Sequence, residues 1–263
     1  MSKLKKRWLS FGIVVAFLVS LGVYASWIEP YWIQVTHHTV PASISRIKIA
    51  HITDLHCSGL GRREQKVIEL VGAEQPDLIV ITGDSINVTS DYPGLHDVLS
   101  QLRAPLGVWV VRGNHEDWWP VRDEGDFYES AGVKLLLNSS AQVSDRIWLV
   151  GFDDLFAGSP DETKAFAGVP ESAYKIALFH SPVYLDQIAG RCDLALAGHS
   201  HGGQVRLPIL GPLWTPPFVG EYFQGWFERR GTKMYVSRGV GTSIADGRFW
   251  CRPEIAILTV GGG

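Results

Sequence analysis

Two imidazole side chains separated by one residue, His199 and His201, lie between glycines and directly follow an apolar run at residues 194–197. Imidazole is the commonest protein ligand for metal ions, and glycine lets the backbone turn sharply beside a bound ion. Four earlier apolar runs are also followed by side chains that can bind a metal: Asp54 and His56, Asp84, Asn114 with His115, and His180. The recurrence of this arrangement indicates a metal site more strongly than the pair alone.

Without His115, seven ligand-competent side chains remain, which exceeds the three or four that one zinc ion uses. Two ions roughly 3.5–4 Å apart, bridged by a carboxylate, would use all seven. Carboxylate, imidazole and amide oxygen together suit Mn, Fe or Zn, whereas Ca²⁺ prefers oxygen alone. Each residue also has an ordinary structural role open to it, Asp84 as a turn residue or His180 as a core histidine. Jointly, the pattern favours two divalent metal ions.

The elements that must position these side chains alternate along the chain. Apolar runs predict strands at residues 47–53, 78–81 and 108–111, and helical periodicity predicts helices at residues 63–73, 92–102 and 122–131. The second half is richer in predicted strands, at residues 134–137, 141–144, 147–150, 176–179, 194–197, 204–207, 234–236 and 255–260. Ligands of such α/β proteins bind beyond the carboxyl ends of the strands. We therefore expect sheets covered by helices, with the metal ligands gathered at one edge.

Composition limits the remaining possibilities. The chain has 263 residues, 46% of them hydrophobic, which suits one large α/β domain at residues 46–263 after an N-terminal segment and a connector at residues 29–45. A formal net charge of −3 gives no electrostatic argument for nucleic acid as a partner. Three scattered cysteines do not form a disulfide framework. The adjacent His37 and His38 lie in the connector, and we expect them to be exposed to solvent.

Residues 1–28 have the pattern of a membrane anchor. Three lysines and Arg7 precede residues 9–27, which carry no charge and, at about 1.5 Å per residue, span roughly the 30 Å of a hydrocarbon core. The basic cluster predicts a cytoplasmic N-terminus and a domain on the outer side of the membrane. Trp8 and Trp27 flank the run as interfacial aromatics do. A signal peptide cleaved near residues 23–25, giving a secreted domain, and a domain facing the cytoplasm remain alternatives.

Five ordered motifs resemble the signature of the calcineurin-like metallophosphoesterases, and the resemblance extends from about residue 47 to the C-terminus. These motifs are Asp54-x-His56, Gly83-Asp84, Gly113-Asn114-His115-Glu116, His180 and Gly198-His199-x-His201. The resemblance implies a four-layer αββα sandwich of two mixed sheets flanked by helices, with a dinuclear metal centre. The anchor, Glu29-Pro30 and the run at residues 237–243 are more specifically similar to the membrane-associated branch of bacterial YaeI and YkuE proteins, which implies a bacterial cell membrane.

The resemblance also implies a role for each residue. Asp54, His56 and His201 would hold one ion, Asn114, His180 and His199 the other, and Asp84 would bridge them. His115 would be a catalytic group rather than a ligand. Many family members carry Asp where this chain has Asn87, and that aspartate pairs with the catalytic histidine. The substitution weakens the support expected for His115, and Glu116 or Asp117 are candidates to replace it.

The expected chemistry follows from charge. Two divalent ions neutralise the oxygens of a phosphoester and lower the pKa of a bound water, so a metal-bridging hydroxide would attack phosphorus while His115 protonates the leaving oxygen. The main alternative from another class is a membrane-tethered binding module without catalysis. Retention of every ligand and of His115 favours the enzyme, a phosphoester or pyrophosphate hydrolase.

The substrate is predicted from the residues around the metal motifs. Trp118 directly follows the His115 motif, and the Pro-rich, aromatic residues 208–226 follow His201, either as an apolar lip that admits an acyl chain or rests on a bilayer, or as a loop packed on the domain. Arg238 and Arg248 either grip a second phosphate or form surface ion pairs. Within the family, hydrolysis of UDP-2,3-diacylglucosamine in lipid A biosynthesis is a reaction of the matching kind, although that nucleotide is cytoplasmic. Broad-specificity action on envelope or small-molecule phosphodiesters is the other expectation.

Overall fold

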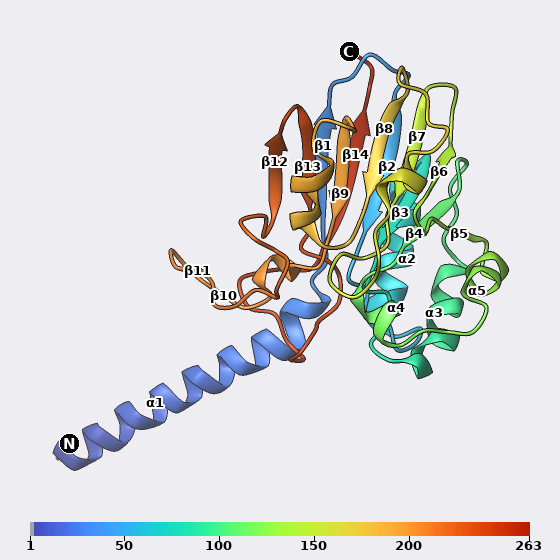
Figure 1. Cartoon of the computed structure of the whole chain (residues 1–263). Helices are drawn as coiled ribbons and strands as arrows, with labels where there is room; N and C mark the ends of the chain where they lie inside the picture. Colours follow the sequence, from blue (N-terminus) through green and yellow to red (C-terminus); the bar gives the residue numbers. More distant parts are fainter. Residues whose placement is uncertain (1–2) are drawn as a thin grey trace.

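Two mixed six-stranded sheets pack face to face in the computed structural model, which describes residues 3–263 (Figure 1). The first sheet has the order β1 (Gln34–Val40), β14 (Glu254–Val260), β2 (Ile47–Ile52), β3 (Leu78–Thr82), β4 (Val108–Val111) and β5 (Val133–Leu135). The second has the order β12 (Gly225–Arg229), β13 (Thr232–Val236), β9 (Leu194–Ala197), β8 (Tyr174–Leu178), β7 (Ile147–Gly151) and β6 (Ser139–Gln142). With helices on the outer faces, this architecture confirms the predicted αββα sandwich.

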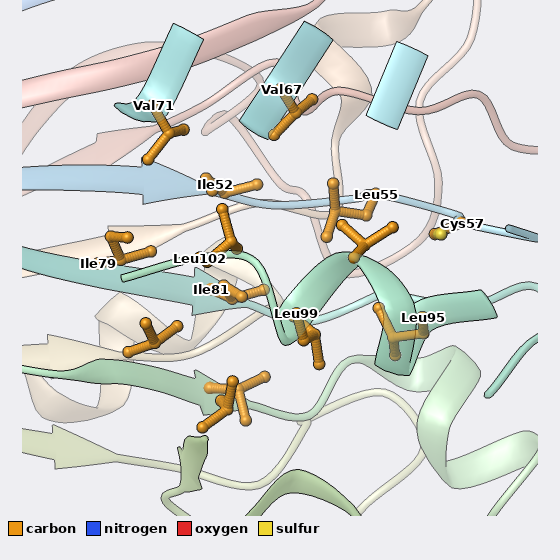
Figure 2. Packing of buried hydrophobic residues seen from close by; sticks show 14 of the residues in the cluster. Ile52, Leu55, Cys57, Val67, Val71, Ile79, Ile81, Leu95, Leu99 and Leu102 are labelled. Carbon is orange, nitrogen blue, oxygen red and sulfur yellow. The ribbon is translucent and has the colours of Figure 1, made fainter. Parts of the chain in front are cut away.

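Helices cover the outer face of each sheet because the central strands, such as β3, β4 and β9, carry buried apolar side chains on both faces. On the first sheet lie α2 (Arg62–Glu74), α3 (Tyr92–Leu99) and α5 (Glu124–Ser130), and on the second lie α6 (Glu162–Ala165) and α7 (Leu185–Ile188). Figure 2 shows Val67 and Val71 of α2 above Ile52 of β2, with Leu99 of α3 beside Ile81. Burial of such side chains stabilises each layer by about 1.5–3 kcal/mol per residue.

The strand register determines where the loops meet. In the parallel strands β2, β3 and β4, Ile52 pairs with Ile81 and Ile81 with Val110, so all three strands end at the same level. In the second sheet, Leu178 of β8 pairs with Leu196 of β9. Because the two sheets are packed against each other through a shared apolar layer, the loops that follow these five strands converge at one edge of the sandwich.

The N-terminal segment projects from the domain as α1 (Lys3–Val23), followed by the short helical turns Tyr24–Ile28 and Glu29–Tyr31 (Figure 1). Lys3–Tyr31 is long and apolar enough to cross a membrane, a test that signal sequences near the N-terminus also pass. The segment predicted as a connector contributes β1, which pairs in parallel with β14 at the edge of the first sheet. His37 is exposed there, whereas His38 is half-buried against Trp226 and Tyr235.

The other differences from the expected elements are local. The strand expected at residues 204–207 is reduced to β10 (Arg206–Leu207), which pairs with β11 (Gly211–Pro212) in a short hairpin. β12 was not predicted because it directly follows a Pro-rich segment with no periodic pattern. A short helix, α4 (Asn114–Trp118), begins directly at one predicted ligand and contains His115.

Candidate metal centre

All eight side chains singled out by the motifs meet at the edge where the strand ends converge. Asp54 and His56 follow β2, Asp84 follows β3, and Asn114 and His115 follow β4. His180 follows β8, and His199 and His201 follow β9. Seven of the side chains are buried: Asp54, His56, Asp84, Asn114, His180, His199 and His201. His115 is half-buried and faces the opening of the site. Side chains from both sheets therefore enclose one polar cluster.

The cluster divides into two groups of ligand atoms. His201 Nε2 lies 3.3 Å from Asp54 Oδ1, and His56 Nε2 lies 3.1 Å from His201 Nε2. In the other group, His180 Nε2 lies 3.2 Å from Asp84 Oδ2 and 3.2 Å from His199 Nδ1. Asp84 Oδ2 also lies 3.7 Å from His56 Nε2. Asp84 thus stands between the two groups, and each contains three ligand atoms within 4.8 Å of one another.

The outward-facing nitrogen of three histidines is already engaged. His180 Nδ1 donates to Thr82 O at 2.7 Å, His199 Nε2 donates to Pro217 O at 2.7 Å, and His56 Nδ1 pairs with Asn87 Oδ1 at 2.9 Å. A ring nitrogen that donates to a carbonyl leaves the other nitrogen with a lone pair directed into the cluster. These bonds orient each imidazole as a metal ligand requires.

Asn114 tests whether the cluster fits a cation. Its Oδ1 atom is buried and has no hydrogen-bond partner anywhere in residues 3–263. An unpartnered buried carbonyl oxygen is costly unless a cation or water satisfies it. Together with the paired imidazole nitrogens and two carboxylates, it forms the mixed oxygen and nitrogen donor set of a transition-metal site. The residues present therefore fit divalent metal ions.

The protonation of the buried groups depends on their mutual contacts. Burial, reinforced by the neighbouring Asp84, raises the pKa of Asp54 to about 7. Burial alone would lower the pKa of His180, but the charges of Asp84 and Asp54 raise it well above the usual value. Burial lowers the pKa of His56 to about 3, so this imidazole is neutral at pH 7. Without metal, the cluster thus retains protons that cations must displace.

The backbone that carries these ligands is strained. Five of them adopt left-handed φ angles: Asp54 (51°), His56 (44°), Asp84 (50°), His199 (69°) and His201 (48°). Such conformations are uncommon in residues other than glycine and persist where surrounding contacts enforce them. One such contact is the backbone amide of His199, which donates to Asp54 Oδ1 at 3.0 Å. Another is the close approach of Gly198, where a Cβ atom would lie 1.9 Å from Thr53 Oγ1.

Glu116 is a supporting residue whose function the sequence did not reveal. Its buried carboxylate accepts hydrogen bonds from the backbone amides of Asp84 (3.0 Å), Ser85 (2.6 Å) and Gly113 (2.8 Å). It therefore joins the loop after β3 to the loop after β4 and does not support His115. The only sequence signal was its position in the motif that contains His115.

The side chain of Asn87 does not pair with His115, which is the role that the resemblance implies for an aspartate at this position. Its side chain pairs with His56, while its backbone carbonyl accepts a hydrogen bond from His115 Nδ1 at 3.1 Å. His115 Nε2 lies 4.0 Å from Asp84 Oδ2. His115 is consequently oriented by a neutral carbonyl, with Nε2 directed toward the cluster.

A cavity of about 840 Å³ opens beside the cluster. Its lining includes His115 and, beyond the polar cluster, apolar side chains such as Trp118, Phe156, Trp214 and Ile244. The ring of Trp118 lies 5.2 Å from that of His115. This arrangement places Trp118 next to the catalytic candidate, and its contact with substrate stays a prediction.

The two arginines predicted to bind substrate do not line this cavity. Arg248 is fully buried, and its guanidinium donates to backbone carbonyls, including those of Gly239 (3.1 Å) and Gly241 (2.7 Å). Arg238 pairs with the buried Glu254 at 3.2 Å. Both guanidinium groups are engaged by the protein, which corrects the expectation that they grip a phosphate. Arg248 instead stabilises the segment that packs against Asp54.

Comparison with known proteins agrees with this geometry. Residues 47–203 match the calcineurin-like phosphoesterase family. The uncharacterized metallophosphoesterase YkuE of Bacillus subtilis is 32% identical over 95% of this chain and 94% of its own length. Phosphodiesterase YaeI of Escherichia coli is 30% identical over 89% and 91%. UDP-2,3-diacylglucosamine pyrophosphatase LpxG of Chlamydia muridarum is 28% identical over 95% of both chains.

The solved structure of TT1561 from Thermus thermophilus shares the fold, with a TM-score of 0.51 at 14% identity over 74% of this chain and 91% of that one. The family match and the named relatives identify the protein as a metal-dependent phosphoester hydrolase. It belongs to the calcineurin-like phosphoesterase family, as its sequence motifs predicted.

Substitution at Gly198 tests the packing that holds Asp54 in place. Gly198→Ala would put a methyl group 1.9 Å from Thr53 Oγ1 and 2.6 Å from Asp54 Oδ2, which displaces this carboxylate. We expect Mn²⁺ affinity, measured by isothermal titration calorimetry, to fall about 10–100-fold. Gly72→Ala is the matched control, because its added methyl group meets open space within α2. Equal Mn²⁺ affinity in both variants would contradict the assignment of Asp54 as a metal ligand.

Proton release tests the electrostatics of the cluster. Below about pH 7, Asp54 carries a proton in the metal-free protein, so protons compete with the cation for its carboxylate. The apparent Mn²⁺ affinity should therefore fall at least about tenfold per pH unit below this value, and less steeply above it, where the raised pKa of His180 leaves one proton to compete. Calorimetry in buffers of different ionisation enthalpy measures the protons released. An affinity independent of pH between about 5 and 8 would contradict this account.

Proposed function

We propose that the chain binds two divalent cations and uses them to hydrolyse a phosphoester or pyrophosphate bond. Asp54, His56 and His201 would hold one ion, and Asn114, His180 and His199 would hold the other. Asp84, which lies between the two groups, would serve both ions. The single observation that carries this proposal is the central position of Asp84, with His56 on one side and His180 on the other. When bound, the two cations neutralise phosphate oxygens and lower the pKa of a coordinated water.

His115 supplies the proton for the leaving oxygen in this proposal. Its Nδ1 atom donates to the carbonyl of Asn87, which fixes the ring and directs Nε2 toward the side of Asp84 that faces the cavity. An imidazole in this position stabilises charge on the phosphoryl oxygens when protonated and can transfer the proton to the departing alkoxide. Trp118 packs against the imidazole and limits its movement.

We further propose that the substrate is an amphiphile whose phosphoester lies at the cluster. Two observations support this: the largely apolar lining of the cavity, and the relative that acts on UDP-2,3-diacylglucosamine. The YaeI relative favours a second candidate, a phosphodiesterase that accepts several envelope or small-molecule substrates. In both cases α1 anchors the protein in the bacterial membrane, and its basic N-terminus favours a domain on the outer side.

Hydrolysis of bis-p-nitrophenyl phosphate with added Mn²⁺ tests the proposed roles. His115→Ala should reduce kcat about 10²–10⁴-fold while the metal content stays unchanged, because the imidazole acts on the substrate and is not a ligand. The exposed His37 lies on β1, pairs with Glu74 and does not line the cavity, so it provides the matched control His37→Ala. Equal background rates in wild type, His115→Ala and His37→Ala would instead favour a binding module without catalysis.

The substrate class is tested with an extract of bacterial membrane lipids. The extract is incubated with the Mn²⁺-loaded wild type or with His115→Ala, and mass spectrometry identifies what disappears. We expect the wild type alone to consume a phosphorylated lipid and to release a product that lacks the esterified group. Consumption of soluble phosphodiesters with no change in the lipids would contradict the lipid assignment and support the broader phosphodiesterase.

A further inference from the structure

A short hairpin beside the cavity exposes an unusual amount of apolar surface. It consists of β10, β11 and the residues around them, and its exposed side chains are Leu207, Ile209, Leu210, Leu213 and Trp214. Ile209 and Leu210 at its turn are 105% and 76% exposed. Contiguous exposed apolar surface on a folded domain marks a contact with a partner or a membrane. We call these residues, with the neighbouring Ile244, the apolar rim.

The hairpin is attached firmly at its base. Arg206 Nη1 donates to the carbonyl of Gly202 at 2.7 Å, and the backbone amide of Leu213 donates to Val205 O at 3.1 Å. Gly203, at φ 83°, lies so close to Pro212 that a Cβ atom would be 2.2 Å from the Cβ of that proline. The base of the hairpin is therefore held against the turn that carries His201. Only the tip of the hairpin is free of packing.

The base of the hairpin is also joined to the residues that follow α1, the helix that is apolar enough to cross a membrane. The backbone amide of Arg206 donates to Phe249 O at 2.9 Å. The residues on either side of Phe249 bind the residues that follow α1. There the buried carboxylate of Glu29 accepts a hydrogen bond from the amide of Trp250 at 2.9 Å and another from the amide of Cys251. The amide of Arg248 donates to Ala25 O at 2.8 Å. These bonds fix the direction of α1 relative to the hairpin.

The two elements leave the domain on the same side. Figure 1 shows the β10–β11 hairpin projecting beside α1, away from the end of the sandwich that carries the C-terminus. Trp27, in the helical turn that follows α1, and Trp250, which donates to Glu29, are both largely exposed. Exposed tryptophans at such a boundary are typical of the interface between lipid and water.

We propose that the apolar rim lies in the interfacial region of the same bilayer that α1 enters, as a second contact between the domain and the membrane. Leu213, Trp214 and Ile244 of the rim also line the cavity beside the metal cluster. An amphiphile can therefore pass from the bilayer along apolar surface toward the cluster without leaving lipid for water. This orientation accounts for apolar side chains that the domain itself leaves uncovered.

A site-specific fluorescent probe tests the proposal on the full chain. The native cysteines, Cys57, Cys192 and Cys251, are all buried, so an introduced surface cysteine reacts selectively with an environment-sensitive nitrobenzoxadiazole label. The labelled Leu210→Cys variant is reconstituted into vesicles of phosphatidylcholine and phosphatidylglycerol, with and without lipids that carry a nitroxide near the headgroup. Ser172→Cys is the matched control, because Ser172 is exposed and precedes β8 at the opposite end of the sandwich.

We expect nitroxide lipids to quench most of the fluorescence at position 210 and to leave position 172 unaffected. Emission at position 210 should also shift to shorter wavelength in vesicles. Equal fluorescence at position 210 with and without nitroxide would overturn the proposal, and a blue shift without quenching would assign the rim to a second copy or another protein. Quenching requires no turnover, so its outcome is independent of whether bis-p-nitrophenyl phosphate is hydrolysed.

Discussion

The burial of two carboxylates at the edge of the sandwich is the constraint on which the rest of the site depends. Asp54 and Asp84 are shielded from water, and an isolated buried carboxylate is costly unless positive charge and hydrogen bonds compensate it. Imidazoles surround the two groups, and the pKa of Asp84 is held well below its usual range because His180 and His56 outweigh the effect of burial. The arrangement that offsets the free-energy cost of burying the two carboxylates also attracts divalent cations strongly.

Neither sheet holds this cluster alone. Both aspartates and Asn114 follow strands of the first sheet, whereas His180 and the His199 motif follow strands of the second. The apolar layer between the sheets therefore determines the distance between the two halves of the site. Glu116 aligns two loops within the first sheet, and Arg248 stabilises the segment against Asp54. Precise placement of ligands thus rests on residues that contact no substrate.

Much of this arrangement could be predicted because it is periodic or local in sequence. Apolar runs located the central strands, and polar residues directly after them located the candidate ligands. The full extent of the edge strand β1 and the roles of Asn87 and Arg248 could not be predicted in this way. Arg248 binds backbone carbonyls near residue 240, and residue types alone do not indicate such a pairing. Asn87 orients His115 through its backbone carbonyl, which the side chain does not indicate either. The apolar rim required the structure, because sequence alone did not distinguish an exposed segment from a packed one.

The central claim is that Asp84 joins two cations, and electron paramagnetic resonance of the Mn²⁺-loaded protein tests it most directly. Two Mn²⁺ ions that share a carboxylate at roughly 3.5–4 Å are magnetically coupled. We predict a coupled dimanganese signal that reaches its maximum at two Mn²⁺ per chain and is replaced by isolated-ion signals in Asp84→Asn. Isolated Mn²⁺ signals alone in the wild type, at every ratio of metal to protein, would contradict the account.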